Sequence, residues 1–307
     1  MLVERAFGQF LSHCQYERNL TGKTLKAYAT DLRQFSAYLS QVGAVEVLDV
    51  DREVVRAFLQ GLYTGYQPRS IKRKMATLKA FFTYLEYEDL IPSSPFRKLR
   101  IKVDRVKDLP RTMTLDTVRK LFAEAYALRD QAKGQKLEAA TRDVALLELM
   151  FATGMRVGEV CGLRMAHVDL DQGSVRVMGK GRRERLVPIC GDKPLDALRS
   201  YASFRALHNG SRQNGAPEFF LSTDGESPVS DQYVRALVRR LADLAGINQH
   251  ITPHMFRHTI ATLLLENGVD IRNIQALLGH SSISVTEIYV RVNEKAQREV
   301  IKEGMPR

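Results

Sequence analysis

The amino-acid pattern changes once along the chain, between Ile91 and Thr112, and this change limits what the chain can fold into. Before it, from Phe7 to Leu90, apolar residues recur three and four positions apart, the spacing of amphipathic helices. Within it, prolines and serines are followed by the charged run RKLRIKVDRVKDLPRT, which has no helical period. The chain's 307 residues also exceed the roughly 100 to 200 that are typical of one domain. We therefore predict two domains joined by a basic linker.

The predicted domains are a helical bundle at residues 1–102 and a second domain at 113–307, with the linker at 103–112. In the second domain, the alternating run Val175–Val177 and the apolar run Leu186–Ile189 flank a glycine-rich basic turn. This arrangement predicts an antiparallel β-hairpin. The other periodic segments are helical. The expected fold class is therefore mainly α with a small antiparallel β-sheet, a helical bundle followed by an α+β domain.

A sharp bend is predicted early in the second domain. Val144–Met150 has the apolar run of a buried helix and leads into FATGMRVGEVCGLR. There Gly154 permits a turn, another helix begins at Val157, and Arg156 lies at the bend between the two. The polar stretch Arg129–Thr141, which precedes the buried helix, is expected to be loop and exposed helix.

Cationic side chains collect on two predicted helices of the first domain, including the amphipathic segment Pro68–Leu90. Cations on helices suit the phosphate contacts that give sequence-independent affinity for DNA, although a solvated face is the alternative. The net charge of +11 and the pI near 9.6 favour a polyanionic partner, with an anionic membrane surface as the rival. The candidate DNA-binding residues are Lys23, Lys26, Arg69, Lys72, Arg73 and Lys79.

Several other classes of protein are excluded by missing patterns. No signal peptide is evident and no apolar run approaches the ~20 residues of a spanning helix, so we expect a cytoplasmic protein with no membrane partner. The 3 cysteines are odd in number and widely spread, which fits neither disulfides nor a zinc knuckle. His254 and His258 lack the glutamate of a zincin motif, and the GKG around Lys180 lacks the rest of a P-loop. No metal or other cofactor is therefore expected.

The stretch His254–Val290 carries the densest set of chemically capable side chains. His254 and Arg257 stand three apart in a helical run, so they share a helix face and can reach the same anion. A second short helix is expected to begin after an Asp270 cap and to end at Gly279, just before His280. A capping-box spacing then predicts a further helix, which carries Tyr289 in its first turns. The stretch has the groups of a site for one phosphodiester.

Two guanidiniums are the natural clamp for a phosphodiester, because negative charge grows on its oxygens in the transition state. Arg156 and Arg257 are the candidates. A tyrosine with a reference pKa near ~10 needs a base or strong local positive charge to act as a nucleophile, and His254 is the candidate base. Lys180, on the hairpin turn, is the candidate acid for the leaving oxygen.

Three motifs, ATGMRVGEVCGLR, GKGRRERLVPI and HMFRHTIATLLLENGVDIRNIQALLGHSSISVTEIYV, together closely resemble the tyrosine recombinase family. The compact length resembles the bacterial Xer recombinases, and TGKTLKAYATDLRQFSAYL looks like the family's SAM-like core-binding domain. The resemblance spans the whole chain and implies a core-binding domain followed by a tyrosine recombinase catalytic domain. It implies either chromosome dimer resolution or a mobile-element or phage role, and the long polar stretch Arg129–Thr141 leaves the second open.

The resemblance also implies a role for each matched residue. Tyr289 would attack the scissile phosphate to form a 3′-phosphotyrosyl link and release a 5′ hydroxyl. The expected supporting residues are Arg156 and Arg257 as phosphate clamps, Lys180 as general acid, His254 for proton transfer and His280 as a hydrogen-bond donor to the phosphate. Neither a metal nor ATP is implied. The expected partners are double-stranded DNA and a homo-tetramer, or a hetero-tetramer with a second recombinase, with a possible accessory or cell-division protein.

Two other functions use the same residues. A type IB topoisomerase-like enzyme would share the nicking chemistry without joining two duplexes. A DNA-binding regulator would keep the fold without the chemistry, and the complete set of six candidate catalytic residues argues against it. Product type and covalent trapping separate these alternatives.

Overall fold

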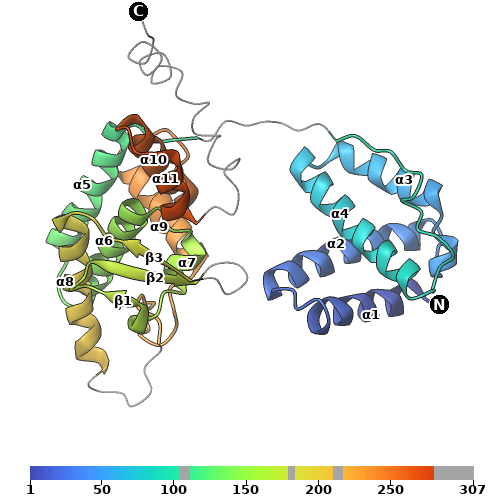
Figure 1. The fold of residues 1–307 in the computed structure, drawn as a ribbon, viewed down its shortest axis with the longest axis horizontal. Coiled ribbons are helices and arrows are strands. Elements are labelled where there is room, and N and C mark those ends of the chain that lie inside the picture. The colour runs from blue at the N-terminus through green and yellow to red at the C-terminus, as the bar shows by residue number, and fades with distance from the viewer. Residues whose placement is uncertain (104–110, 179–183, 210–216, 280–307) are drawn as a thin grey trace, which may run out of the picture. The chain divides into compact units, whose positions relative to one another are not determined.

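The structure is a computed structural model, and it describes residues 1–103, 111–178, 184–209 and 217–279. Contacts within the chain group it into two compact units, Met1–Asp108 and Leu109–Arg307 (Figure 1). Each unit has its own hydrophobic core. None of the helices in these described ranges is long and apolar enough to cross a membrane.

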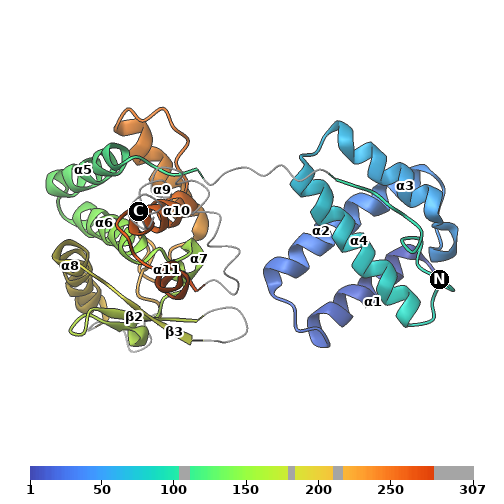
Figure 2. The ribbon, with the colours of Figure 1, turned by 45° about the horizontal axis from the view of Figure 1, so that its top comes forward.

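The regular elements of the first unit, among its described residues, are all helices. Its elements are α1 (Val3–Tyr16), α2 (Gly22–Gln41), α3 (Arg52–Gly61) and α4 (Pro68–Tyr87), with the short 3₁₀ turns η1 (Val47–Asp49) and η2 (Leu62–Thr64) beside α3 (Figure 2). Thr21 is the N-cap of α2, because its hydroxyl accepts a hydrogen bond from the Thr24 amide. The Phe35 ring packs against Phe58 and Phe82 in the core. The predicted helical bundle is confirmed.

A buried carboxylate joins α2 to α4. Asp31 is only 2% exposed, and it accepts hydrogen bonds from the Lys74 ammonium at 3.1 Å and the Thr77 hydroxyl at 2.9 Å. The Arg73 guanidinium pairs with the same carboxylate. An uncompensated buried charge would be costly, so these donors are what allows Asp31 to be buried. The cations of α4 therefore include two that hold the bundle together.

The second unit is built around α6 (Gln135–Thr153), in which every residue from Thr141 to Met150 is buried. Helices α5 (Leu115–Gln131), α8 (Asp192–Asn209) and α10 (Pro253–Glu266) contact α6. The remaining helices are α7 (Val157–Cys161), α9 (Asp231–Leu244) and α11 (Ile271–Leu278). The short α7 follows α6 directly, so the predicted bend at Gly154 is present, and α11 ends at Gly279 as expected.

An antiparallel sheet lies at one side of this unit, with strand order β1-β2-β3 (Figure 1). Its strands are β1 (Val168–Asp169), β2 (Ser174–Met178) and β3 (Glu184–Pro188), and the 3₁₀ turn η3 (Met165–His167) precedes β1. Val175 pairs with Val187 and both are buried, whereas the next pair, Arg176 with Leu186, is exposed. This alternation confirms the predicted hairpin, and with it the mainly α fold with a small antiparallel sheet. The two residues of β1 are too few to carry a pattern.

The stretch Arg129–Thr141 is loop and largely exposed or half-buried helix, as the sequence predicts. Helix α5 continues to Gln131 and α6 begins at Gln135, and the short loop between them ends at Gly134, whose φ is +57°. Thr141, at the end of the stretch, is buried. The polar composition of the stretch thus reflects a short loop and the exposed ends of two helices.

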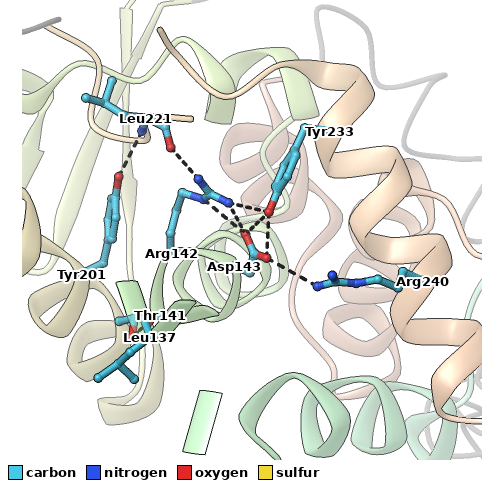
Figure 3. A network of polar contacts seen from close by, with 8 residues as sticks. All are labelled: Leu137, Thr141, Arg142, Asp143, Tyr201, Leu221, Tyr233 and Arg240. Carbon is cyan, nitrogen blue, oxygen red and sulfur yellow. Dashed lines mark hydrogen bonds and ion pairs between the residues drawn. The ribbon is translucent and has the colours of Figure 1, made fainter. Parts of the chain in front are cut away.

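A polar network anchors the buried part of α6 (Figure 3). Arg142 and Asp143 form an ion pair at 3.0 Å, and both are nearly inaccessible to solvent. The Tyr233 hydroxyl, from α9, donates to Asp143 at 2.8 Å, and Arg142 donates to the Leu221 carbonyl at 2.9 Å. Tyr201, from α8, accepts a hydrogen bond from the Leu221 amide at 3.0 Å. The network thus fixes the central helix to α8 and α9 before the chain reaches the bend at Gly154.

Candidate active site

Arg257 lies one turn inside α10, and its guanidinium holds the ends of two other helices. The side chain is 4% exposed. One terminal nitrogen donates to the Gly154 carbonyl at 2.7 Å and the other donates to the Leu278 carbonyl at 2.6 Å. Gly154 is the C-cap of α6 and Leu278 is the last residue of α11. These are helix-end carbonyls, which attract cations because they lack partners within the helix.

Gly154 brings the bend close to α10 and α11. Its φ of +60° is left-handed, and a Cβ added there would lie 2.6 Å from Leu278 Cδ2 and 3.1 Å from Ile260 Cγ2. Both the backbone conformation and the close approach therefore require glycine. Arg156 follows two residues later, so the packing of Gly154 determines where Arg156 stands.

Arg156 is exposed and serves as the N-cap of α7, with Glu159 at the third helical position. The Glu159 carboxylate accepts from the Arg156 amide at 2.9 Å and from its guanidinium at 2.9 Å. Arg185, on β3, donates to the same carboxylate at 2.9 Å and 3.3 Å. Burial raises the pKa of Glu159, but the hydrogen bonds from Arg185 and Arg156 outweigh it and hold this pKa below its usual value. Glu159 is thus an anion that bridges two arginines.

His254 lies on α10, one turn before Arg257, and much of its side chain is exposed. Partial burial lowers the pKa of His254, and the cations of Arg235, Arg257 and Arg156 lower it further, against a smaller opposing effect of Asp231. The imidazole is therefore neutral at pH 7, the form that can accept a proton. Arg257 binds the Gly154 carbonyl two residues before Arg156, and His254 lies one turn before Arg257, so the three residues come from elements that are in contact.

Half of the predicted catalytic set is therefore brought together by the structure. Lys180, His280 and Tyr289 lie outside the described residues. The described ends nearest to them are Met178 and Glu184, which pair across the hairpin, and Gly279, which ends α11. The roles of all six residues stay predictions.

The candidate DNA-binding side chains differ in their surroundings. Lys23 and Lys26, on α2, are exposed, as are Arg69 and Lys79 on α4. Lys72 is partly buried. Arg73 is exposed but pairs with the buried Asp31, so part of its charge supports the bundle.

Three residues of the site were missed by sequence reasoning: Glu159, Arg185 and Arg235. Glu159 had a usable signal, because a glutamate at the third position of a helix after a bend marks a capping box. Arg185 is one cation in a basic run, and Arg235 is one of several on α9, so neither had a distinguishing pattern. Among the residues that the structure describes, no group of three or more His, Cys, Asp and Glu side chains is arranged to hold a metal ion.

Comparison with known proteins places this chain in one family. The phage integrase family model matches residues 111–296, and the phage integrase N-terminal SAM-like domain matches residues 7–89. The chain therefore belongs to the phage integrase family, whose members are tyrosine recombinases, enzymes that cleave and rejoin DNA. The resemblance found in the three sequence motifs is confirmed.

The matched relatives cover nearly the whole chain. A tyrosine recombinase of Agathobacter rectalis is 40% identical over 99% of this chain and 97% of its own length. Tyrosine recombinase XerC of Thermodesulfovibrio yellowstonii is 35% identical over 97% of this chain and 95% of its own. The crystal structure of XerH site-specific recombinase bound to palindromic difH substrate has a TM-score of 0.73, with 22% identity over 96% of this chain and 83% of that one. This last likeness concerns the fold.

Proposed function

We propose that this chain is a site-specific recombinase that cuts DNA through a 3′-phosphotyrosyl intermediate and exchanges strands between two duplex sites. The observation that carries the proposal is the grouping of Arg156, His254 and Arg257 in a chain that belongs to the tyrosine recombinase family. Two arginines and a neutral imidazole are the groups that phosphodiester cleavage by a phenol requires.

In the proposed reaction, the Tyr289 oxygen attacks the scissile phosphorus and the bond to the 5′ oxygen breaks. Arg156 and Arg257 bind the non-bridging oxygens, and His280 donates a further hydrogen bond to them. His254 assists the proton transfer from the tyrosine, and Lys180 protonates the leaving 5′ oxygen. The phosphotyrosyl link keeps the energy of the broken backbone bond. A 5′ hydroxyl from a partner duplex can therefore reverse the step and complete the exchange, without metal or ATP.

The proposed assembly is a tetramer of this chain, or of this chain with a second recombinase, on two synapsed duplexes. The XerC relative, matched over 97% of this chain, supports a chromosomal role, and a mobile-element or phage role is the alternative. Sequencing of the DNA ends in covalent complexes trapped in cells tests both. A single chromosomal site supports dimer resolution, whereas ends at the borders of an element support the alternative. Reactions with purified protein in EDTA and without ATP test the cofactor requirement.

Product analysis separates recombination from its two rivals. Exchange between two sites on one plasmid supports the proposal. Relaxation of supercoils without exchange would indicate a topoisomerase-like enzyme, and absence of any covalent adduct on a nicked suicide duplex would indicate a DNA-binding regulator.

The exposed cations of the first unit give a prediction about salt. Replacing both Lys26 and Arg69 with Ala should reduce the slope of log affinity against log salt by roughly 0.9 for each phosphate that the protein no longer neutralises. Arg73 is unsuitable for this test because it also pairs with the buried Asp31. The matched control is Arg52→Ala with Arg56→Ala on α3, where both cations pair with Glu53. If the slope were unchanged in the first variant, Lys26 and Arg69 would be solvated side chains that do not contact the phosphates.

The environment of His254 gives a prediction about pH. In an NMR titration of the free protein, His254 should titrate below the usual imidazole pKa of ~6.5. Arg235→Gln should raise this midpoint, because Arg235 is the cation that lowers it most. Arg239→Gln, also exposed on α9, is the control. Since the unfolded chain has the higher pKa, neutral His254 favours the folded state above ~6.5, and this contribution is lost as the pH falls through the folded pKa. A midpoint above 6.5 would contradict the prediction.

A further inference from the structure

Arg185 contacts the site without belonging to the predicted catalytic set. It lies on β3, opposite Val177 in the hairpin, and its side chain is 16% exposed. Its two terminal nitrogens reach the two Glu159 carboxylate oxygens at 3.3 Å and 2.9 Å. A two-point contact of this kind between arginine and carboxylate fixes geometry as well as charge. The second strand of the hairpin is thereby tied to the N-terminus of α7.

The other side of Arg185 meets the end of α11. A Cβ added to Gly279 would lie 2.9 Å from Cδ, Nε and Cζ of Arg185, so the glycine backbone lies directly against the guanidinium. Gly279 has a left-handed φ of +65°. Arg257 holds the same helix end through the Leu278 carbonyl. Two arginines from different elements therefore fix the residue from which the chain continues to His280 and Tyr289.

The net charge of Arg156, Glu159 and Arg185 determines how strongly Arg156 attracts a phosphate. Each Glu159 oxygen is shared, because Oε1 accepts from both guanidiniums while Oε2 accepts from the Arg156 amide and from Arg185. Two cations on one carboxylate leave a net positive charge. If Arg185 were absent, Arg156 and Glu159 would form a neutral pair, and a neutral pair attracts a phosphate far less than a guanidinium does.

We propose that Arg185 is a positioning residue for DNA cleavage. It shares the Glu159 carboxylate, so that this carboxylate does not fully offset the positive charge that Arg156 presents to the phosphate, and it holds the backbone at Gly279. This inference rests on the proposed function of Arg156 as a phosphate clamp. It predicts that the loss of Arg185 impairs chemistry rather than DNA binding, since Arg185 is mostly covered by its neighbours.

The test compares Arg185→Gln, Glu159→Gln and the double variant with the wild type. The single-turnover rate of covalent cleavage is measured in the full chain on a nicked duplex that carries the site recovered by end sequencing. Arg185→Gln should slow cleavage by roughly 10- to 100-fold, the usual cost of losing a residue that positions another, with DNA affinity close to that of the wild type. Adding Glu159→Gln restores the net positive charge and should recover part of the rate. Arg176→Gln, exposed on β2, controls for loss of a charge from the sheet.

The double variant distinguishes this role from a structural one. If Arg185 had only a structural role, the double variant would cleave no faster than Arg185→Gln, and that result would overturn the proposal. A wild-type cleavage rate for Arg185→Gln would also overturn it. If Arg185→Gln does not fold, Arg185→Lys keeps the charge and should cleave within about tenfold of the wild type. A loss in Arg185→Lys as complete as that of a nucleophile variant would also overturn it. Failure of the wild-type protein to form any adduct would instead count against the proposed function.

Discussion

Tyr289→Phe is expected to bind DNA as tightly as the wild type and to form no covalent adduct. The substitution removes one oxygen and leaves the charge of the protein at neutral pH unchanged. Without the phenol there is no atom to attack the phosphorus, and the cleavage rate should fall by roughly 10⁶-fold, the size of the loss when a hydrolase loses its nucleophile. Covalent complexes on a nicked suicide duplex, resolved in denaturing gels, measure the result.

The other tyrosines of the second unit support this choice of nucleophile. Tyr126 donates its hydroxyl to Glu148 at 2.7 Å, and burial together with that bond raises its pKa. Burial and Asp143 raise the pKa of Tyr233 to about 12. Burial also raises the pKa of Tyr201, whose oxygen accepts from the Leu221 amide. Each of the three is held in its neutral form by the fold, so none of them is prepared to attack a phosphate.

A second tyrosine variant serves as the control for this experiment. Tyr87→Phe changes an exposed residue at the end of α4 and should leave the adduct yield unchanged. An adduct that persists in Tyr289→Phe would show that another residue is the nucleophile. Peptide mapping of the DNA-linked fragment would then identify it.

Local rules predicted much of the fold because the elements carry strong local signals. The bend at Gly154 and the end of α11 at Gly279 each depend on one residue type with a specific conformational reason. Polar composition indicated loop and exposed helix over Arg129–Thr141, but it could not place the loop, which lies between Gln131 and Gln135. The two residues of β1 have no pattern, and pairing with β2 alone makes them a strand.

The candidate site was less accessible to sequence reasoning, because its contacts join distant parts of the chain. His254 and Arg257 could be placed on one helix face from their spacing. The hydrogen bonds from Arg257 to Gly154 and Leu278, and the bridge from Glu159 to Arg185, link residues whose separation carries no periodic signal. Sequence reasoning also assigned the two clamp arginines the same role, whereas their surroundings differ: Arg156 is exposed and Arg257 is buried.

This difference in burial leads to different expected free energies of unfolding for variants of the two arginines. Arg156→Gln and Arg257→Gln should each reduce the cleavage rate by roughly 10²- to 10³-fold, because each removes a preorganised donor to the phosphate. Arg156→Gln should leave the free energy of unfolding nearly unchanged, since the exposed side chain makes a surface ion pair and the amide bond to Glu159 remains. Arg257→Gln should lower the free energy of unfolding by about 3 kcal/mol, because two helix-end carbonyls lose charged donors inside the protein.

Urea denaturation of the two variants measures this contrast, with Arg239→Gln on α9 as the control for loss of an exposed arginine. Equal stability of the two variants would mean that the carbonyl bonds of Arg257 contribute nothing to the fold. A stability loss confined to Arg257→Gln, together with a cleavage defect in both variants, would show that Arg257 both stabilises the fold and takes part in cleavage. The guanidinium that joins the ends of α6 and α11 would then also be the one that binds the phosphate, so that cleavage depends on the same contacts that assemble the catalytic unit.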